Sequence, residues 1–532
     1  MKSTFLLQRF SKTLMVNNKL KIVIPKILFF TITLSFWITN TLFAQELTSY
    51  GVTGRGGVAT TFATDYQAIG VNPANLAIRK SFRDPKITFG FLEGNIGFYT
   101  ENITFDQILK SYFPKTFNSG DNYQLTYPQK EKAARDLTSG SISTTINSTL
   151  FGLHLSSEKL GGFAFSIRDR LDFYSKTNST LSEILFLGQN ASYFTNLLLS
   201  NGQTIANSSD LPQATRDQVV FGFRPENESL TYGEVMNNST VQMLWTREYN
   251  FAYGTKIVDS YNVQVFAGIG VRYISGITLI DLEARNNVFI GETIALSPSF
   301  PVEGFSIDSP TNLGYEPKKG FARFATPKPI GNGYGIDFGL NIVIKRNLYL
   351  GASLVNYGRM SWTGNVYNIT NGILAQTQGR GFDNYNFITY SSETFQLGGE
   401  GSALSWEGSE KFDDELPAML RLGGSYEFFK TAHLGFDVVV PLNIDAPGSL
   451  ASNLYAIGGD LRLSKLLTLS SGVSTGGNQD FNINIPVGLT YHARRGHYEA
   501  GFSTQDITSF ILDIEDGGNN ISFALGFLRF KF

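Results

Sequence analysis

Few residues of this chain have the types and spacing that catalysis requires. The sequence has no Cys and only four His, namely His154, His433, His492 and His497. Thiolate nucleophiles, disulfides and Cys-ligated metals are therefore excluded. It also has no nucleophile elbow, P-loop, dinucleotide fingerprint or His-Glu-x-x-His motif. We therefore predict that the protein is not an enzyme and uses no cofactor or metal.

Two small clusters could still bind a cation. His492 and His497 flank a short turn, close enough in sequence to share a metal. Asp413, Asp414 and Glu415 could offer carboxylate oxygens to a divalent ion. Both clusters lie at predicted strand ends, where side chains are usually solvated, and we favour solvation in both places.

The composition favours aromatic, Gly-rich β-structure. Aromatic residues make up 14% of the 532 residues, Gly accounts for 54, and charged residues for 17%. Typical soluble domains have about 25% charged residues. The first 44 residues carry six basic and no acidic residues, so the rest has a net charge of −8. Nucleic-acid binding requires a basic surface and is therefore excluded as an expectation.

The N-terminus has the pattern of a secretory signal peptide. A Lys-rich leader precedes an uncharged apolar stretch from Ile27 to Ala44. We predict a signal peptide at 1–44 that is cleaved after Ala44. An uncleaved membrane anchor is the alternative, because a spanning helix needs about 20 residues. A secreted chain of this composition is either a soluble β-protein or an outer-membrane barrel.

Period-two alternation of apolar and small or polar residues decides between these two. Barrel strands need about 9–11 residues with one face for lipid and one for the lumen. Fourteen segments fit this pattern, at 87–99, 142–155, 161–174, 240–254, 261–282, 333–344, 347–358, 417–428, 433–441, 453–463, 466–474, 483–492, 497–512 and 521–532.

The connections between these segments separate by length. None of those after the even-numbered strands is longer than six residues. The four longest, at about 100–141, 175–239, 283–332 and 359–416, all follow odd-numbered strands. Outer-membrane barrels have short periplasmic turns and long outer loops, whereas a soluble sandwich has no reason to sort its loops. We predict an all-β fold, a closed antiparallel transmembrane β-barrel of about 14 strands over 87–532, in the outer membrane of a Gram-negative cell.

The chain ends in a strand with aromatic residues. Gly526, Leu528, Phe530 and Phe532 share one parity. A terminal Phe on an alternating strand resembles the signal that barrel-insertion machinery reads, so this machinery and outer-membrane lipid are expected partners. The alternative is an ordinary edge strand, but an exposed apolar edge promotes aggregation and barrel closure removes it.

A Gly-rich segment, 45–86, precedes the first strand and contains Asn72-Pro73-Ala74-Asn75. Here the sequence resembles the long-chain fatty-acid transporter (FadL-like) superfamily of fourteen-stranded barrels, in which an Asn-Pro-Ala motif lies in an N-terminal hatch inside the barrel. Asn75 departs from the Gly that is common at that position. The resemblance implies that 45–86 is a hatch in the lumen, and the alternative is a flexible periplasmic tail.

A second resemblance lies further along the chain. The stretch 333–339, continued through 350–354, 356–358 and Trp362, is similar to a hairpin of FadL-like barrels and of the related barrel subunit of the type IX secretion system. Both resemblances concern architecture more than substrate.

Charged residues on the inward parity line the predicted lumen. Their signs are mixed, whereas a selective ion pore favours one sign at its constriction. We therefore expect mutual ion pairs and contacts with the hatch. The candidates are Arg168, Arg170, Glu248, Arg272, Asp337, Arg421, Asp460 and Arg462.

The resemblance implies an outer-membrane channel for hydrophobic or amphipathic small molecules. The alternative is a non-transporting barrel subunit of a larger complex for secretion, barrel assembly or surface attachment, with outer-membrane and periplasmic proteins as partners. The long outer loops suit ligand capture and partner docking equally. An outer-membrane enzyme is a distant third alternative, and the sequence does not identify the ligand.

Overall fold

The computed structural model describes residues 49–532 except 80–83, 101, 105–106, 108–109, 112–122, 139, 300–309, 311–312, 315–321, 371, 386–405, 430, 478–482, 494–495 and 512–518. The chain divides into two units, Met1–Leu42 and Phe43–Phe532. The predicted signal peptide and its cleavage site lie outside the described residues. Everything below concerns the second unit.

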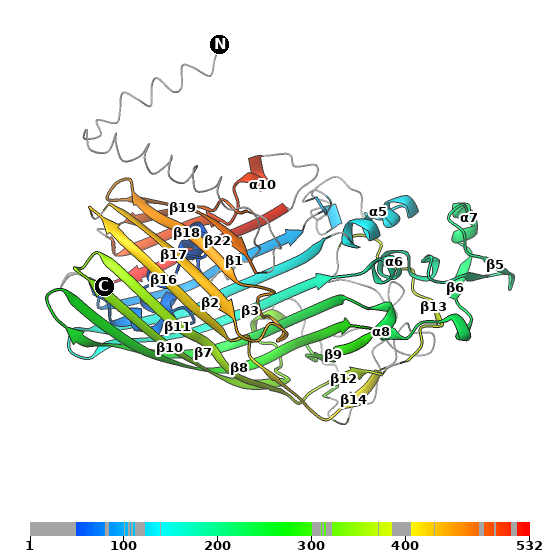
Figure 1. The fold of residues 1–532 in the computed structure, drawn as a ribbon, viewed down its shortest axis with the longest axis horizontal. Helices are drawn as coiled ribbons and strands as arrows, with labels where there is room; N and C mark the ends of the chain where they lie inside the picture. Colours follow the sequence, from blue (N-terminus) through cyan, green and yellow to red (C-terminus); the bar gives the residue numbers. More distant parts are fainter. Residues whose placement is uncertain are drawn as a thin grey trace, which may run out of the picture. The chain divides into compact units, whose positions relative to one another are not determined.

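Fourteen antiparallel strands form a closed barrel wall (Figure 1). Each pairs with its neighbour in the chain order of the wall, and β1 pairs with both β2 and the C-terminal β22, which closes the sheet. This topology confirms the predicted fold class. The wall strands are β1 (Ile87–Thr100), β2 (Ser141–Ser157), β3 (Gly161–Lys176), β7 (Ser239–Asp259), β8 (Val263–Arg285), β10 (Gly331–Ile344), β11 (Leu348–Trp362), β16 (Met419–Phe428), β17 (Ala432–Pro441), β18 (Leu454–Arg462), β19 (Leu467–Gly476), β20 (Val487–Ala493), β21 (Tyr498–Thr504) and β22 (Asn519–Lys531).

The two faces of the wall differ because successive side chains of a strand point to opposite sides. Large apolar side chains such as Phe163, Phe251 and Phe436 are about half exposed on the outer face. Inward residues such as Glu248 and Arg421 are buried. An exposed apolar outer band with a polar interior is the arrangement of a barrel that spans a membrane.

Two details of the last strands differ from the sequence prediction. The predicted strand 497–512 is shorter, because β21 ends at Thr504 and helix α10 (Thr508–Ile511) follows. Gly526 lies on the inner face, not on the face of Leu528 as expected. The pairing of β21 with β22 shifts register between Glu499 and Gly501, so Phe527 and Leu528 both point outward.

The short connections lie at one end of the barrel, and the long ones fold at the other end. Figure 1 shows α5, α6, α8 and β9 at the strand ends that lie away from the C-terminus. Strands β9 (Val288–Leu296), β12 (Val366–Ile369), β14 (Trp406–Ser409) and β15 (Phe412–Glu415) extend the wall sheet, so the predicted loops 283–332 and 359–416 contain strands. A separate four-stranded sheet consists of β4 (Asn196–Leu199), β5 (Thr204–Ala206), β6 (Val219–Phe223) and β13 (Gln376–Thr377).

Helices of this outer region are mostly short. They are α5 (Tyr127–Thr138), α6 (Ser179–Leu187), η3 (Gly188–Asn190), α7 (Gln213–Arg216), η4 (Glu226–Glu228), α8 (Tyr232–Val235) and α9 (Ala322–Ala325). Asn178 caps α6 by accepting a hydrogen bond from the Leu181 amide. Within the described residues, no helix is long and apolar enough to cross a membrane.

Candidate functional site

The residues before β1 fold into a compact segment that contacts the inner face of the wall. We name Ser49–Arg79 the lumen segment. It contains α3 (Tyr50–Gly54) and two 3-10 helices, η1 (Asp65–Ala68) and η2 (Pro73–Ala77). Eight of the ten residues in one buried apolar cluster belong to it, and the other two are Ala164 and Ala252 of the wall. The lumen segment therefore has a small core of its own.

The predicted Asn-Pro-Ala-Asn motif begins η2. Pro73 occupies the first helical turn, where its missing N–H costs no hydrogen bond. Asn72 caps the helix, because its Oδ1 accepts from the Ala74 amide at 3.1 Å, and its Nδ2 donates to Leu340 O of β10 at 3.1 Å. Asn75 donates to Thr60 O and Ala63 O and accepts from Asn341 of β10 at 2.8 Å. Both Asn side chains thus join the turn to the rest of the segment and to the wall.

A ring of wall glycines receives the lumen segment. Each of the fourteen strands contributes one glycine at which an added Cβ would come within 3.0 Å of an atom in residues 50–76. At Gly162 that Cβ would lie 2.0 Å from Leu76 O, and at Gly254 it would lie 2.4 Å from Pro73 O. We name this set the glycine girdle; it comprises Gly90, Gly152, Gly162, Gly254, Gly268, Gly339, Gly351, Gly423, Gly435, Gly458, Gly472, Gly488, Gly501 and Gly526. The segment therefore contacts the wall around its whole circumference.

Buried charges also join the lumen segment to the wall. Asp437 Oδ2 of β17 accepts from the amides of Ala59 and Thr60 at 3.0 and 2.8 Å and from the Thr60 hydroxyl at 2.7 Å. Arg421 of β16 lies 3.3 Å from the same oxygen and donates to Gly57 O at 3.3 Å. Arg55 pairs with Asp460 of β18 at 3.1 Å. Two of the predicted lumen-facing residues, Arg421 and Asp460, therefore contact the segment directly.

A third anchor lies where the first and last strands meet. Arg529 of β22 pairs with Asp65 at 2.5 Å and with Glu499 of β21 at 3.1 Å. The Tyr66 hydroxyl donates to Glu93 of β1 at 2.5 Å, and burial raises the pKa of Tyr66, which keeps this donor protonated. The sequence prediction did not include Asp65, Glu93 or Arg529 among the site residues. The inward parity of Arg529 was the available signal.

Four other predicted lumen residues form a chain of ion pairs across β3, β7, β8 and β10. Glu248 lies 2.8 Å from Arg168 and 3.4 Å from Arg272, and Arg272 also pairs with Asp337. All four are buried. A Cβ on Gly70 of the lumen segment would lie 3.2 Å from Arg168 Nη2, so the chain borders that segment. The opposite signs satisfy one another within the wall.

The remaining candidates lie apart from this chain. Arg170 pairs with Asp172 at 2.5 Å and donates to Gly448 O, in the β17–β18 connection, at 3.0 Å. Arg462 is the last residue of β18, is exposed, and donates to Ser464 O at the turn. Phe530 of the terminal strand packs against Phe89 at a centroid distance of 5.3 Å, and Phe532 is exposed at the barrel end.

The two candidate cation clusters make separate local contacts. His492 lies 3.0 Å from Glu499, whereas His497 contacts Lys531 O at 2.7 Å. Asp413 is exposed and pairs with Lys411 at 2.6 Å. Within the part of the chain that the structure describes, no group of three or more His, Asp or Glu is arranged to hold a metal ion.

Fold and site together define a closed fourteen-stranded barrel with a folded N-terminal segment against its inner face. The family described as "Family of unknown function (DUF5723)" matches residues 83–495, and the chain belongs to this family. No curated protein matches the sequence.

The chain is similar in fold to three solved transporters. The toluene transporter TbuX of Ralstonia pickettii is 12% identical, with 91% of this chain and 98% of that chain covered and a TM-score of 0.41. A FadL homologue of Pseudomonas aeruginosa is 13% identical, with 92% and 100% covered and a TM-score of 0.40. The toluene transporter TodX of Pseudomonas putida is 12% identical, with 92% and 98% covered and a TM-score of 0.36.

Proposed function

We propose that this chain is an outer-membrane channel for hydrophobic or amphipathic small molecules, with the lumen segment as its hatch. The proposal includes cleavage of residues 1–44 during export and insertion of the barrel by the cell's barrel-insertion machinery, with Phe530 and Phe532 in the terminal signal. The ligand class comes from the sequence resemblance to FadL-like proteins. The proposal includes no catalytic step.

The observation that carries the proposal is the fit between the lumen segment and the glycine girdle. A fourteen-stranded barrel encloses more space than its own side chains fill, since about eight strands already reach that limit. Here every wall strand has a glycine where the segment approaches. The inner wall is therefore shaped around a separate folded piece, which must rearrange before anything crosses that level of the barrel.

The contacts of the segment are compatible with such a rearrangement. Many of its wall contacts are hydrogen bonds and ion pairs, including those of Asp437, Asp460 and Arg529. Its apolar residues mostly pack against one another. Water can replace polar contacts when part of the segment moves, whereas exposing an apolar core would be costly.

A reversible crosslink tests whether the hatch must move. The hydroxyls of Thr61 and Ser425 lie 2.7 Å apart, and the chain has no native Cys, so Thr61→Cys with Ser425→Cys would form the sole disulfide. In liposomes, the unmodified barrel is expected to take up a fluorescent fatty-acid analogue. The oxidised double variant should lose uptake, and a reductant should restore it. The single variant Thr61→Cys is the matched control.

Two outcomes would contradict the proposal. Equal uptake by the oxidised and reduced double variant would show that the hatch is static during transport. No uptake above empty liposomes by the unmodified barrel would exclude the channel itself.

The second candidate function is a non-transporting subunit of an outer-membrane complex. The favouring observation is the separate sheet β4–β5–β6–β13, which has its own buried cluster of Leu197, Leu199 and Val219. A folded element away from the barrel wall provides a rigid surface for a protein partner. Stoichiometric co-purification of another protein, together with absent uptake, would favour this function.

A further inference from the structure

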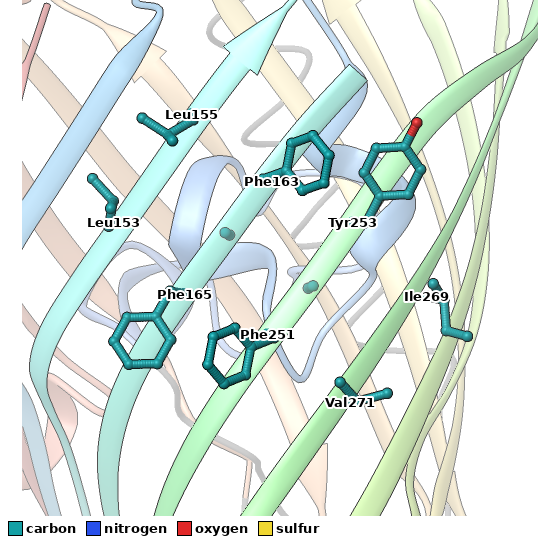
Figure 2. Close-up of a pocket in the computed structure, with 10 residues that line it drawn as sticks. Leu153, Leu155, Phe163, Phe165, Phe251, Tyr253, Ile269 and Val271 are labelled. Atoms are coloured by element: carbon teal, nitrogen blue, oxygen red, sulfur yellow. The ribbon is translucent and has the colours of Figure 1, made fainter. Parts of the chain in front are cut away.

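An apolar groove lies on the outer surface of the wall, across β2, β3, β7 and β8. Two cross-strand aromatic pairs bound it: Phe163 with Tyr253, at a centroid distance of 4.6 Å, and Phe165 with Phe251, at 4.8 Å. Figure 2 shows the two pairs separated along the strands, with Leu153 and Leu155 on one side and Ile269 and Val271 on the other. The space between them has a volume of about 280 Å³.

The floor of the groove is thin. Ala164 and Ala252 form it, and both point toward the lumen, where they pack in the same cluster as Leu76. Larger inward residues are absent here because η2 of the lumen segment lies against this part of the wall, as the close approach of Pro73 to Gly254 shows. The groove therefore lies directly outside the docking site of η2.

The position along the strands places the groove in one leaflet. Phe163 and Phe165 are the third and fifth residues of β3, about 7–14 Å from its start at a rise of about 3.3 Å per residue. Half of a hydrocarbon core is about 15 Å thick. Beyond the groove, the Tyr253 hydroxyl donates to Leu160 O in the β2–β3 turn at 2.7 Å, which places a polar group near the headgroup level.

We propose that this groove binds one acyl chain of a phospholipid from the periplasmic leaflet. The leaflet assignment rests on the outer-membrane orientation proposed above, in which the short turns face the periplasm. The groove is continuous with the lipid-facing belt, since Phe163, Phe251 and Val271 belong to both. Its volume is just below the roughly 300–1,000 Å³ of typical small-molecule pockets, so it accommodates a stretch of one chain. Its lining contains no charged side chain.

The bound chain has a different role from a transported ligand. It fills a gap in the outer surface where the wall is thinnest, and so supports the strands against which η2 packs. This proposal does not depend on transport, because a channel and a complex subunit would both retain the lipid.

A groove-filling substitution tests the proposal. Ile269 lines the groove and is 44% exposed, and Ile269→Trp should occupy the space. Ile457 of β18 is a matched outward position, 38% exposed and away from the groove, so Ile457→Trp is the control. The full-length barrel and both variants are incorporated into phosphatidylethanolamine nanodiscs, then transferred to detergent. Retained phosphatidylethanolamine is counted per barrel by quantitative mass spectrometry.

The unmodified barrel and Ile457→Trp should each retain about one more phospholipid than Ile269→Trp. Equal retention by all three proteins would overturn the proposal, as would equal loss in both variants. A barrel isolated from cells that carries lipopolysaccharide or a second copy of the chain at this face, shown by crosslinking from Val271, would also overturn it. The heat-dependent gel shift of folded barrels confirms that each variant is folded before its lipid is counted.

Discussion

Phe436 and Asp437 are neighbours on β17, yet they meet different surroundings. Phe436 is 50% exposed on the outer face, whereas Asp437 is 1% exposed and accepts three hydrogen bonds from the lumen segment. The outer face needs only apolar side chains, because lipid adapts to its shape. The inner face needs particular partners at particular positions, because a packed interior does not adapt. The two faces of one strand therefore have different tolerances to substitution.

The largest effect is expected on the inner face. Asp437→Ala would leave the buried Arg421 without its anionic partner and remove the acceptor of the Ala59 and Thr60 amides. Breaking a buried ion pair in this way costs about 3–5 kcal/mol. Urea unfolding of the barrel in lipid vesicles measures the loss.

The matched control for Asp437→Ala is Asp413→Ala, because Asp413 and Lys411 form an exposed pair. Its expected cost is about 0–1 kcal/mol. A similar loss of stability in both variants would show that the contacts of Asp437 with the lumen segment contribute nothing special.

The next effect concerns the outer face of the same strand. Phe436→Arg should destabilise the inserted barrel by about 2–4 kcal/mol if residue 436 lies near the bilayer midplane. Phe428→Arg, at the end of β16 near a short turn, should cost only about 0–1 kcal/mol because it lies near the interface. The same vesicle unfolding assay compares the two. Equal penalties at both depths would contradict a lipid-facing outer surface.

The difference between the faces also explains what could be predicted from the sequence. All fourteen wall strands and the parity of the loops were predictable, because alternation such as that of Phe436 and Asp437 follows directly from strand geometry. The face of Gly526 was predicted wrongly, because a bulge shifts the parity by one residue and leaves no mark in the alternation.

The contacts of the inner face were less predictable. The sequence indicated that Arg421 and Asp460 face inward, but not that they contact the lumen segment. The glycine girdle was not recognised, since each wall glycine is ordinary within its own strand. Only the pairing register places Gly162 and Gly254 next to each other beside η2. Long-range complementarity of this kind depends on tertiary structure, which one sequence does not display.

A single methyl group tests the girdle. Gly254→Ala would place a Cβ 2.4 Å from Pro73 O, a backbone atom that cannot move without the turn. Overpacking of this kind costs about 1–3 kcal/mol. Gly94→Ala is the control, because its Cβ would lie 3.6 Å from the nearest atom, an ordinary contact. Limited proteolysis should cut the lumen segment faster in Gly254→Ala than in Gly94→Ala, and equal rates would argue against a tight fit.

The smallest expected effect lies at the outer rim, where Asp414 of β15 is partly buried. Burial raises the pKa of Asp414 to about 7, and the nearby Asp281 carboxylate adds to the shift. In the unfolded chain an Asp releases its proton near pH 3.9. Between about pH 4 and pH 7 the folded rim therefore holds a proton that the unfolded chain has lost, so the stability of the rim falls as the pH rises through this window. Because Asp414 is not fully enclosed, we expect a change below about 1 kcal/mol.

Hydrogen exchange can measure this change locally, at the pairing of β15 with Arg359–Trp362 of β11. After correction for intrinsic exchange, these amides should be less protected at pH 8 than at pH 5 in the unmodified barrel. Asp414→Asn should remove the difference, because an amide side chain neither titrates nor repels Asp281. The β16–β17 pairing around Gly423 and Asp437 is an internal reference for global opening. A pH-dependent loss of protection that persists in Asp414→Asn would assign the effect to another group and would leave Asp414 without influence on the rim.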